Sequence, residues 1–418
     1  MPREPQLRTE YPGPAARKLL AGAAKHVLGP GGTPVAVESA SGARVVDVDG
    51  NVHLDFASGL YGNQTGHAHP TVVRAAIEKA QRLTVSYGFP YVDNDAVDLA
   101  ERLRSAAPGR FLGPVSFACS GEPALAAAVE SAMAATGRSR IAVFTDEPSC
   151  REEAAVRLPY PDCRRCPVGK NPGSCGVECL EKCIETLDGD EFRGEVAAAV
   201  FPLARVAGGF ATPDMDFVAG FAEFAKKRKI LLIADEIVTG FGRTGKLFAS
   251  AYYKLTPDII VCGGGLGTGM SLGAVTYKSR RTADAARPGA GTADPMSVAA
   301  AAAAVDLVER ELAANARSMG GYLIDKLEGL LEESRVAGVV HGKGLLIGLE
   351  VVKDPGSGEP DGDRRDAIAG ECRRRGLLVE TAGPESIVFA PPLIVTKDQI
   401  DVAVRIIGDV LNTIKPFK

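Results

Sequence analysis

The sequence predicts an α/β fold built on a mostly parallel β-sheet, and three segments carry this prediction. Residues 195–202, 230–234 and 258–262 are apolar runs of strand length. Continuous apolar runs, rather than alternating ones, are typical of strands that are buried on both faces of a parallel sheet. Helical patterns at 217–228 and 246–253 lie between these runs.

The N-terminal part of the chain contains both helical and strand patterns. An amphipathic segment at 15–28 ends in a Gly-Pro-Gly-Gly sequence, and alternating strands follow around a turn at 49–51. Pro70 suits the first turn of the next helix, and residues 93–105 are predicted to form another.

The middle and the end of the chain show a similar mixture. Residues 117–137 read as a strand, a turn and a helix, and 140–144 as the next strand. A single helix is predicted over 296–319, and the pattern from about residue 320 onward is α+β.

Composition excludes several classes of protein. The chain has 418 residues, 45% of them hydrophobic, and a formal net charge of -4. There is no basic excess for nucleic-acid binding, no apolar run of transmembrane length and no hydrophobic signal core at the N-terminus. We therefore expect a cytoplasmic protein that binds neither nucleic acid nor membrane.

The segment at 230–275 contains the strongest chemical signal. Its first strand ends in Asp235 and Glu236, and open α/β sheets bind their ligands at the carboxyl ends of their strands. The second strand runs into a glycine loop at 263–269, where the backbone can approach a ligand closely.

These residues resemble the signature of class III aminotransferases. The similarity lies in DEIVTGFGRTG at 235–245, PDII at 257–260 and SLGAV at 271–275, and it extends over about residues 15–415. The resemblance implies a fold-type-I pyridoxal-phosphate (PLP) transferase with a mostly parallel seven-stranded sheet. It also implies a large domain at 51–319 and a small α+β domain formed by 1–50 and 320–418.

The resemblance also implies roles for single residues. Asp235 matches the carboxylate that pairs with the pyridinium nitrogen of PLP. The lysine that forms the Schiff base lies seven residues after the proline of the PDI motif in this family. Counting from Pro257 gives Gly264, and no lysine lies between Lys254 and Lys278. A PLP enzyme uses that amine to hold the aldehyde and to move a proton. Lys246 or Lys278 could replace it only if the fold brought one of them to the cleft.

Other motifs of the family are altered as well. Ser120 and Gly121 match its phosphate-binding turn, but Glu122 stands at the hydroxyl position and Pro123 lacks an amide donor. Thr292 matches a threonine that reaches the phosphate bound by the neighbouring subunit. Arg205 and Asp294 are expected near the same pocket. Arg205 belongs to the segment that replaces the family motif Glu-Pro-x-Gln-Gly. Asp294 belongs to the segment that departs from the family motif Gly-Thr-Phe/Tyr-(Gly-Gly)-Asn-Pro.

Five of the nine cysteines cluster in a segment at 159–184. A similar insert occurs in the subgroup that includes 4-aminobutyrate aminotransferase-like enzymes. Free thiols, a disulfide, and bound zinc or an iron–sulfur cluster are the alternatives. The metal alternative is predicted to use four ligands: Cys163, Cys166, Cys175 and Cys179.

The altered motifs lead to a functional prediction. We expect a homodimeric aminotransferase homologue that holds no covalent cofactor, does not use PLP and carries metal, if any, at the cysteines. It is expected to act as a cofactor-independent biosynthetic enzyme on a small polar metabolite, with Glu122 and Asp235 as catalytic residues. Two alternatives remain open. One is a non-catalytic partner subunit of an active aminotransferase or biosynthetic enzyme. The other is a transaminase with non-covalently bound PLP or pyridoxamine phosphate (PMP).

Overall fold

The computed structural model describes residues 4–27, 35–85, 92–144, 152–171, 174–285, 293–331, 337–354 and 358–414. The chain forms two compact units. Unit 1 comprises Met1–His69, Gly208–Phe210 and Asn315–Lys418, and unit 2 comprises Pro70–Ala207 and Ala211–Ala314. The predicted α/β fold class is confirmed. The domain boundaries expected from the family remain a prediction.

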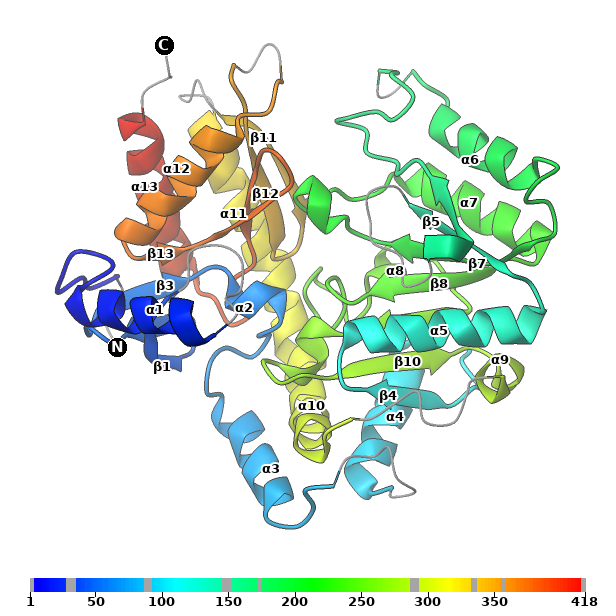
Figure 1. Ribbon diagram of the computed structural model, residues 1–418, viewed down its shortest axis with the longest axis horizontal. Helices are drawn as coiled ribbons and strands as arrows, with labels where there is room; N and C mark the ends of the chain where they lie inside the picture. The colour runs from blue at the N-terminus through cyan, green and yellow to red at the C-terminus, as the bar shows by residue number, and fades with distance from the viewer. Residues whose placement is uncertain are drawn as a thin grey trace. The chain divides into compact units, whose positions relative to one another are not determined.

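Unit 2 is organised around a seven-stranded sheet with the order β4-β10-β9-β8-β7-β5-β6 (Figure 1). Five neighbouring strands, β5 to β9, are parallel, whereas β10 is antiparallel to β9 and to β4. The strands are β4 (Val115–Ala118), β5 (Arg140–Phe144), β6 (Ala155–Leu158), β7 (Val196–Pro202), β8 (Leu231–Glu236), β9 (Ile259–Cys262) and β10 (Gly273–Tyr277). Every residue of β7, β9 and β10 is buried, which explains why their sequences are apolar without alternation.

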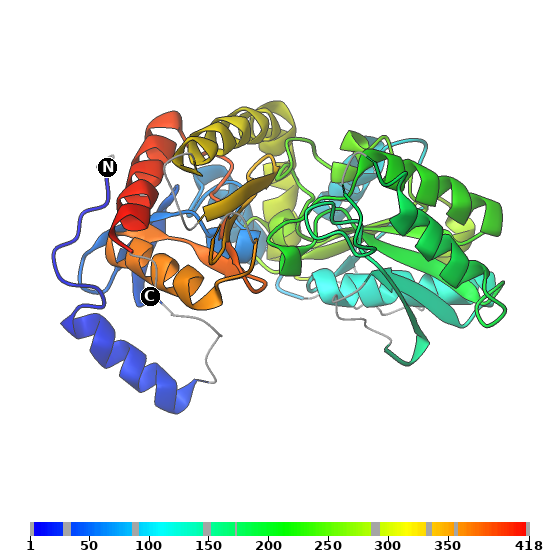
Figure 2. The same ribbon diagram turned by 90° about the horizontal axis from the view of Figure 1, so that it is seen from above.

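Helices cover both faces of this sheet, and Figure 2 shows α5 and α7 on opposite sides of it. The helices of unit 2 are α3 (Pro70–Ala80), α4 (Asn94–Ala106), α5 (Gly121–Thr136), α6 (Glu178–Asp188), α7 (Met215–Arg228), α8 (Ala249–Tyr252), α9 (Arg280–Asp284) and α10 (Pro295–Leu307). Short 3₁₀ turns lie at η1 (Glu152–Ala154), η2 (Val206–Gly208) and η3 (Gly264–Gly267). The carboxylate of Asp214 caps α7 by accepting the amides of Asp216 and Phe217 at 2.8 and 3.2 Å.

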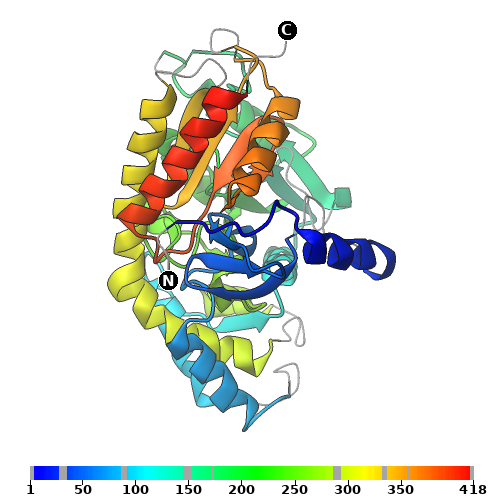
Figure 3. The same cartoon turned by 90° about the vertical axis from the view of Figure 1, so that its left-hand side faces the viewer.

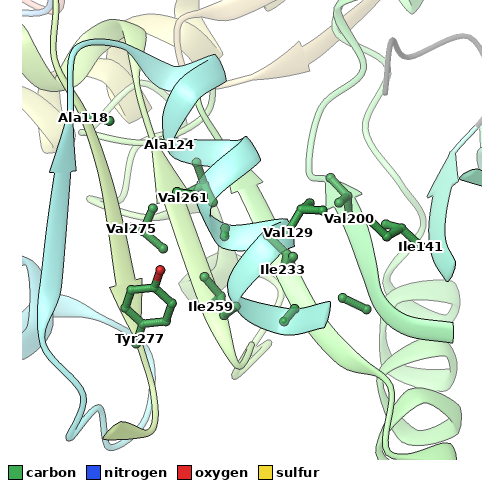
Figure 4. Packing of buried hydrophobic residues seen from close by; sticks show 14 of the residues in the cluster. Ala118, Ala124, Val129, Ile141, Val200, Ile233, Ile259, Val261, Val275 and Tyr277 are labelled. Atoms are coloured by element: carbon green, nitrogen blue, oxygen red, sulfur yellow. The ribbon is translucent and has the colours of Figure 1, made fainter. Parts of the chain in front are cut away.

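The core of unit 2 lies between α5 and the sheet (Figure 4). Small residues of the helix, such as Ala124 and Ala128, face branched residues of the strands, such as Ile233 and Val261. The alanines let the helix approach the sheet closely. In this layer the Tyr277 hydroxyl lies 2.9 Å from the hydroxyl of Ser131, so the two buried polar groups are partners.

One predicted helix is divided. The segment predicted as a single helix over 296–319 is α10, followed by a π-helical turn, η4 (Val308–Leu312), and then α11 (Ala313–Leu331). A π turn inserts one residue into the helical repeat, and an alanine-rich sequence carries no periodic signal that would reveal the insertion.

Unit 1 contains two four-stranded sheets with the orders β1-β2-β3-β13 and β11-β12-β15-β14. Figure 3 shows α12 and α13 side by side on the second sheet. The strands are β1 (Val37–Ser41), β2 (Arg44–Asp47), β3 (Val52–Asp55), β11 (Ala337–Lys343), β12 (Leu346–Val351), β13 (Leu377–Leu378), β14 (Glu380–Ala382) and β15 (Ser386–Phe389). Its other helices are α1 (Pro14–His26), α2 (Ser58–Tyr61), α12 (Gly362–Arg374) and α13 (Lys397–Thr413). No helix in the described ranges is long and apolar enough to cross a bilayer.

Candidate functional site

The carboxyl ends of three parallel strands meet around Asp235. In the sheet register Asp235 pairs with Pro202 at the end of β7 and with Val261 near the end of β9. Because side chains alternate along a strand, Asp235 and Glu236 point to opposite faces of the sheet. The two adjacent carboxylates therefore have different environments.

Glu236 has a structural role. It is buried, and it accepts the amides of Ala249 and Ser250 at 2.6 and 2.7 Å and the hydroxyl of Thr239 at 3.1 Å. These bonds fix the first turn of α8, which explains why the helix begins at Ala249 and not at Lys246 as predicted.

Asp235 has the features of a binding residue. Its Oδ1 accepts the amide of Ile237 at 3.0 Å, and the residue is only partly exposed. Desolvation, with a smaller contribution from the charge of Glu236, raises the pKa of Asp235 to about 6. No cationic side chain contacts Asp235 in the described part of the chain. A carboxylate held without a cation at a strand end is suited to a cationic ligand.

Three backbone segments meet next to Asp235 at two glycines. A Cβ atom built on Gly263 would lie 2.5 Å from the Cα atom of Gly121, and one on Gly121 would lie 2.7 Å from Cγ2 of Ile237. Only glycine permits such contacts. The turn after β9, the start of α5 and the segment after β8 thus form one continuous surface. The structure therefore brings the predicted residues Ser120, Gly121 and Gly264 to the same edge as Asp235.

Gly264 is exposed at the start of η3 and has a φ angle of +30°. A Cβ atom at this position would lie 3.0 Å from the carbonyl oxygen of Ile237. The position matched to the family's lysine is therefore open to solvent beside the Asp235 segment, and it offers no amine.

The start of α5 combines features that favour and oppose the binding of an anion. Ser120 is the N-cap residue, but its side chain makes no capping bond, and the exposed Glu122 lies in the first turn. Amide groups at a helix N-terminus attract phosphate. The carboxylate of Glu122 opposes that attraction, and Pro123 has no amide hydrogen.

Arg205 follows β7 by three residues, and its contacts lie toward the cysteine segment. Its guanidinium stacks 5.4 Å from the ring centroid of Tyr160 and lies 3.6 Å from the carboxylate of Asp162. Asp162 is also bound by Arg164 at 3.0 and 3.1 Å. The sequence did not single out Asp162, because its role depends on a contact between distant segments.

Asp294 caps α10 by accepting the amide of Met296 at 3.2 Å and the hydroxyl of Ser297 at 2.9 Å. It also lines a hollow of about 520 Å³ with Cys119 and Ser271. These contacts support a structural role for Asp294. Thr292 lies outside the described residues.

Ile237 is the residue that sequence reasoning missed. It contacts both Gly121 and Gly263 and would present an apolar wall beside Asp235. Its sequence position gave no signal, because Ile237 lies in the turn after β8, where the alternation of a strand no longer applies.

Lys278 is not a replacement for the missing amine. Its amide donates to the carbonyl of Asp258 at 2.9 Å, at the start of β9 and thus at the edge of the sheet opposite Asp235. Lys246 is exposed in the turn after β8.

The four cysteines predicted as metal ligands line a hollow of only about 20 Å³. All four are free thiols. Desolvation, together with the neighbouring thiols, raises the pKa of Cys179 to about 11. Within the described ranges, no group of three or more His, Cys, Asp or Glu side chains is arranged to hold a metal ion.

Comparison with known proteins gives a consistent family. Residues 28–156 and 148–411 match the family model described as aminotransferase class III. The chain is 31% identical to the acetylornithine aminotransferase of Methanothermobacter thermautotrophicus over 391 residues, which cover 91% of this chain and 94% of that protein. It is 30% identical over 397 residues to the leucine/methionine racemase of Thermococcus litoralis, with 88% of each chain covered.

A solved structure shows the same fold with its cofactor. The amine transaminase from an uncultivated Pseudomonas species, in its PLP-bound internal aldimine form, has a TM-score of 0.81 and 27% identity. The match covers 93% of this chain and 98% of that chain.

These findings correct the cofactor prediction. The expectation that the chain does not use PLP and that zinc or an iron–sulfur cluster binds at the cysteines is wrong, because a solved relative of the same fold holds PLP and the described cysteines form no metal site. The altered motifs were weighted too heavily. Asp235 and the close packing of the glycines around it are present, and the cysteine side chains are not placed as metal ligands in the described segments.

Proposed function

Because the chain belongs to the class III aminotransferase family, we propose that it performs amino-group chemistry with PLP or PMP held by non-covalent contacts. The observation that carries the proposal is Asp235, a carboxylate with a pKa of about 6 and no cationic neighbour among the described residues. A protonated ring nitrogen would supply the missing positive charge.

The residues of the site fit the ring end of this cofactor well and its phosphate end in part. Asp235 would bind the ring nitrogen, and Ile237 would provide an apolar contact beside it. The amides of Gly121 and Glu122 at the start of α5 would face the phosphate, but the carboxylate of Glu122 weakens that end. Weak phosphate binding and the absence of an amine at Gly264 both favour a cofactor that dissociates readily.

When bound, such a cofactor supplies an electron sink for the carbon that carries the amino group. Asp235 keeps the ring nitrogen protonated, because an adjacent carboxylate favours the charged form of a cation. Gly264 cannot move the substrate proton. We assign that task to Glu122, an exposed carboxylate next to the two glycines.

The substrate class follows from the relatives. An acetylornithine aminotransferase and an amino-acid racemase both act on small amino compounds, which supports an amino or keto acid as substrate. Class III aminotransferases are typically dimers, and we propose a homodimer for this chain.

A second candidate function is that of a partner subunit. Gly264 favours it, because a chain without the amine could still complete a dimer with an active aminotransferase. A homodimer that binds PMP and catalyses amino-group exchange without a second protein would exclude this alternative.

The test combines a spectrum with matched variants. The purified protein is mixed with PLP or PMP, and binding is followed by absorbance and by calorimetry. We expect saturable binding that dialysis reverses, and no attachment to the protein after borohydride treatment. Gly264→Lys is expected to retain PLP through dialysis and to become labelled by borohydride, whereas Gly264→Ala, the control for backbone strain, is not.

Two further variants separate the roles of the carboxylates. Asp235→Asn should weaken PMP binding at least tenfold. Glu122→Gln should tighten PMP binding and slow amino-group exchange, because the same carboxylate repels the phosphate and carries the proton. Absence of binding by the wild-type protein, or slower exchange without tighter binding in Glu122→Gln, would contradict the proposal.

A further inference from the structure

Four lysines from three elements line one hollow at the edge of the large sheet opposite Asp235. Lys226 and Lys229 come from the end of α7, Lys254 from the loop after α8, and Lys278 from the end of β10. The hollow has a volume of about 800 Å³ and includes Leu231, at the start of β8. This volume lies within the usual range for small-molecule sites, roughly 300–1,000 Å³.

The four ammonium groups outnumber the three carboxylates that line the same hollow. None of the four lysines makes an ion pair or a side-chain hydrogen bond in the described ranges. Three carboxylates share the lining, those of Asp216, Glu223 and Asp258. Glu223 is paired with Lys227, outside the hollow, at 2.7 Å, and Asp258 accepts the amide of Leu232 at 3.0 Å. Asp216 and Asp258 make no ion pair in the described part of the chain, so the four lysines face two unpaired carboxylates.

The end of α7 does not account for this charge. A helix C-terminus carries only about half a negative charge, and its effect is limited to the last turn. The last turn already contains Arg228, which is paired with Asp188 on the outer side. Lys254 and Lys278 belong to other elements. Their convergence with the α7 lysines thus has no structural explanation in the pairs described.

Apolar side chains also line the hollow. They include Val218 and Ala222 of α7 together with Leu255 and Leu231. A hollow lined by both lysines and apolar side chains is suited to an anion that also carries an organic ring. Lysines bind phosphate groups as point charges, and several of them attract a polyanion more strongly than a single-charge ligand.

We propose that this hollow binds a polyphosphate anion, such as a nucleoside triphosphate, as a second ligand site of the protein. For brevity we call it the lysine hollow. It is lined by Lys226, Lys229, Lys254 and Lys278, and it does not depend on the cofactor chemistry at the other edge of the sheet.

Titration calorimetry on the full-length protein tests the proposal with ATP, tripolyphosphate and AMP as probes. We expect saturable one-site binding of ATP and tripolyphosphate, and at least tenfold weaker binding of AMP. Tighter binding of ATP than of tripolyphosphate would identify the nucleoside as part of the ligand, and equal binding would identify the polyphosphate chain alone. Affinity should fall steeply as salt is raised.

The double variant Lys254→Gln with Lys278→Gln should bind ATP at least tenfold more weakly. The double variant Lys18→Gln with Lys25→Gln is the matched control, because it also removes two lysines, and both are exposed on α1, outside the hollow. Thermal unfolding of each variant verifies that the fold is retained. Absence of saturable binding at millimolar ATP, or equal weakening in the control and the test variant, would overturn the proposal.

Discussion

Replacing Asp235 by asparagine removes a carboxyl group whose ionised form is unfavourable in the folded protein without a ligand. Desolvation, with a smaller contribution from Glu236, raises the pKa of Asp235 from 3.8 to about 6. Between these values the folded state binds a proton more tightly than the unfolded state does. Stability is therefore lost as pH rises through this window, and it does not recover above it.

The size of the effect follows from the two pKa values. Their difference corresponds to about 3 kcal/mol of unfolding free energy above pH 6. This is an upper bound, because Asp235 keeps some contact with solvent. Asparagine has nearly the same shape, and its side-chain oxygen can still accept the amide of Ile237.

The assay is urea unfolding of the cofactor-free protein and of Asp235→Asn at about pH 4.5 and about pH 8. We expect the variant to be more stable by about 1 kcal/mol at the lower pH, where the carboxyl of the unfolded chain is already largely ionised, and by up to about 3 kcal/mol at the higher pH. The other titrating groups contribute equally to the stability of both proteins, so their contributions cancel in the comparison. An equal difference at both pH values, or a less stable variant at pH 8, would refute the reasoning.

Three further predictions concern the frame of the site and of unit 1. Gly263→Ala should lower the unfolding free energy by about 1–3 kcal/mol in urea, because its Cβ would overlap the backbone of Gly121. Gly321→Ala, with open space around its Cβ in α11, should not lower it. Glu236→Ala should lower the melting temperature strongly and the unfolding free energy by about 3 kcal/mol or more, because it leaves the buried amides of Ala249 and Ser250 unpaired. Glu236→Gln should lower the unfolding free energy less. Burial lowers the pKa of His53, so the unfolded chain binds a proton more readily than the folded protein does. The unfolding free energy should therefore fall as pH drops below about 6.5. His53→Gln should remove this pH dependence from unfolding curves recorded between about pH 5 and about pH 7.5.

The large sheet could be predicted from sequence because its strands are buried on both faces. β5 has the predicted bounds, and β7 to β9 differ from prediction by one or two residues. An apolar run bounded by glycine or charged residues leaves few alternatives. The division of the predicted helix over 296–319 could not be foreseen, since it depends on one extra residue in a helical turn.

The site was predictable where it depends on strand ends and not where it depends on contacts between distant segments. Asp235 follows a buried strand, so its place at the edge of the sheet could be inferred. The contact of Gly121 with Gly263, the pairing of Arg205 with Asp162 and the distance of Lys278 from the cleft all depend on how separate segments pack. The cofactor prediction failed for a related reason. It relied on substitutions at single motif positions, whereas the position of Asp235 and the packing of Gly121 against Gly263 do not depend on those substitutions.

The position of β10 constrains how the chain can be synthesised. β4 is the first strand of the large sheet to leave the ribosome, and its neighbour in the sheet is β10, the last one made. Ala118 must remain without its partner Gly273 until nearly two thirds of the chain has been translated. During that interval the nascent polypeptide exposes an unpaired strand, and such species aggregate or recruit chaperones. Expression at low temperature, which slows synthesis and aggregation together, should therefore favour native protein over inclusion bodies.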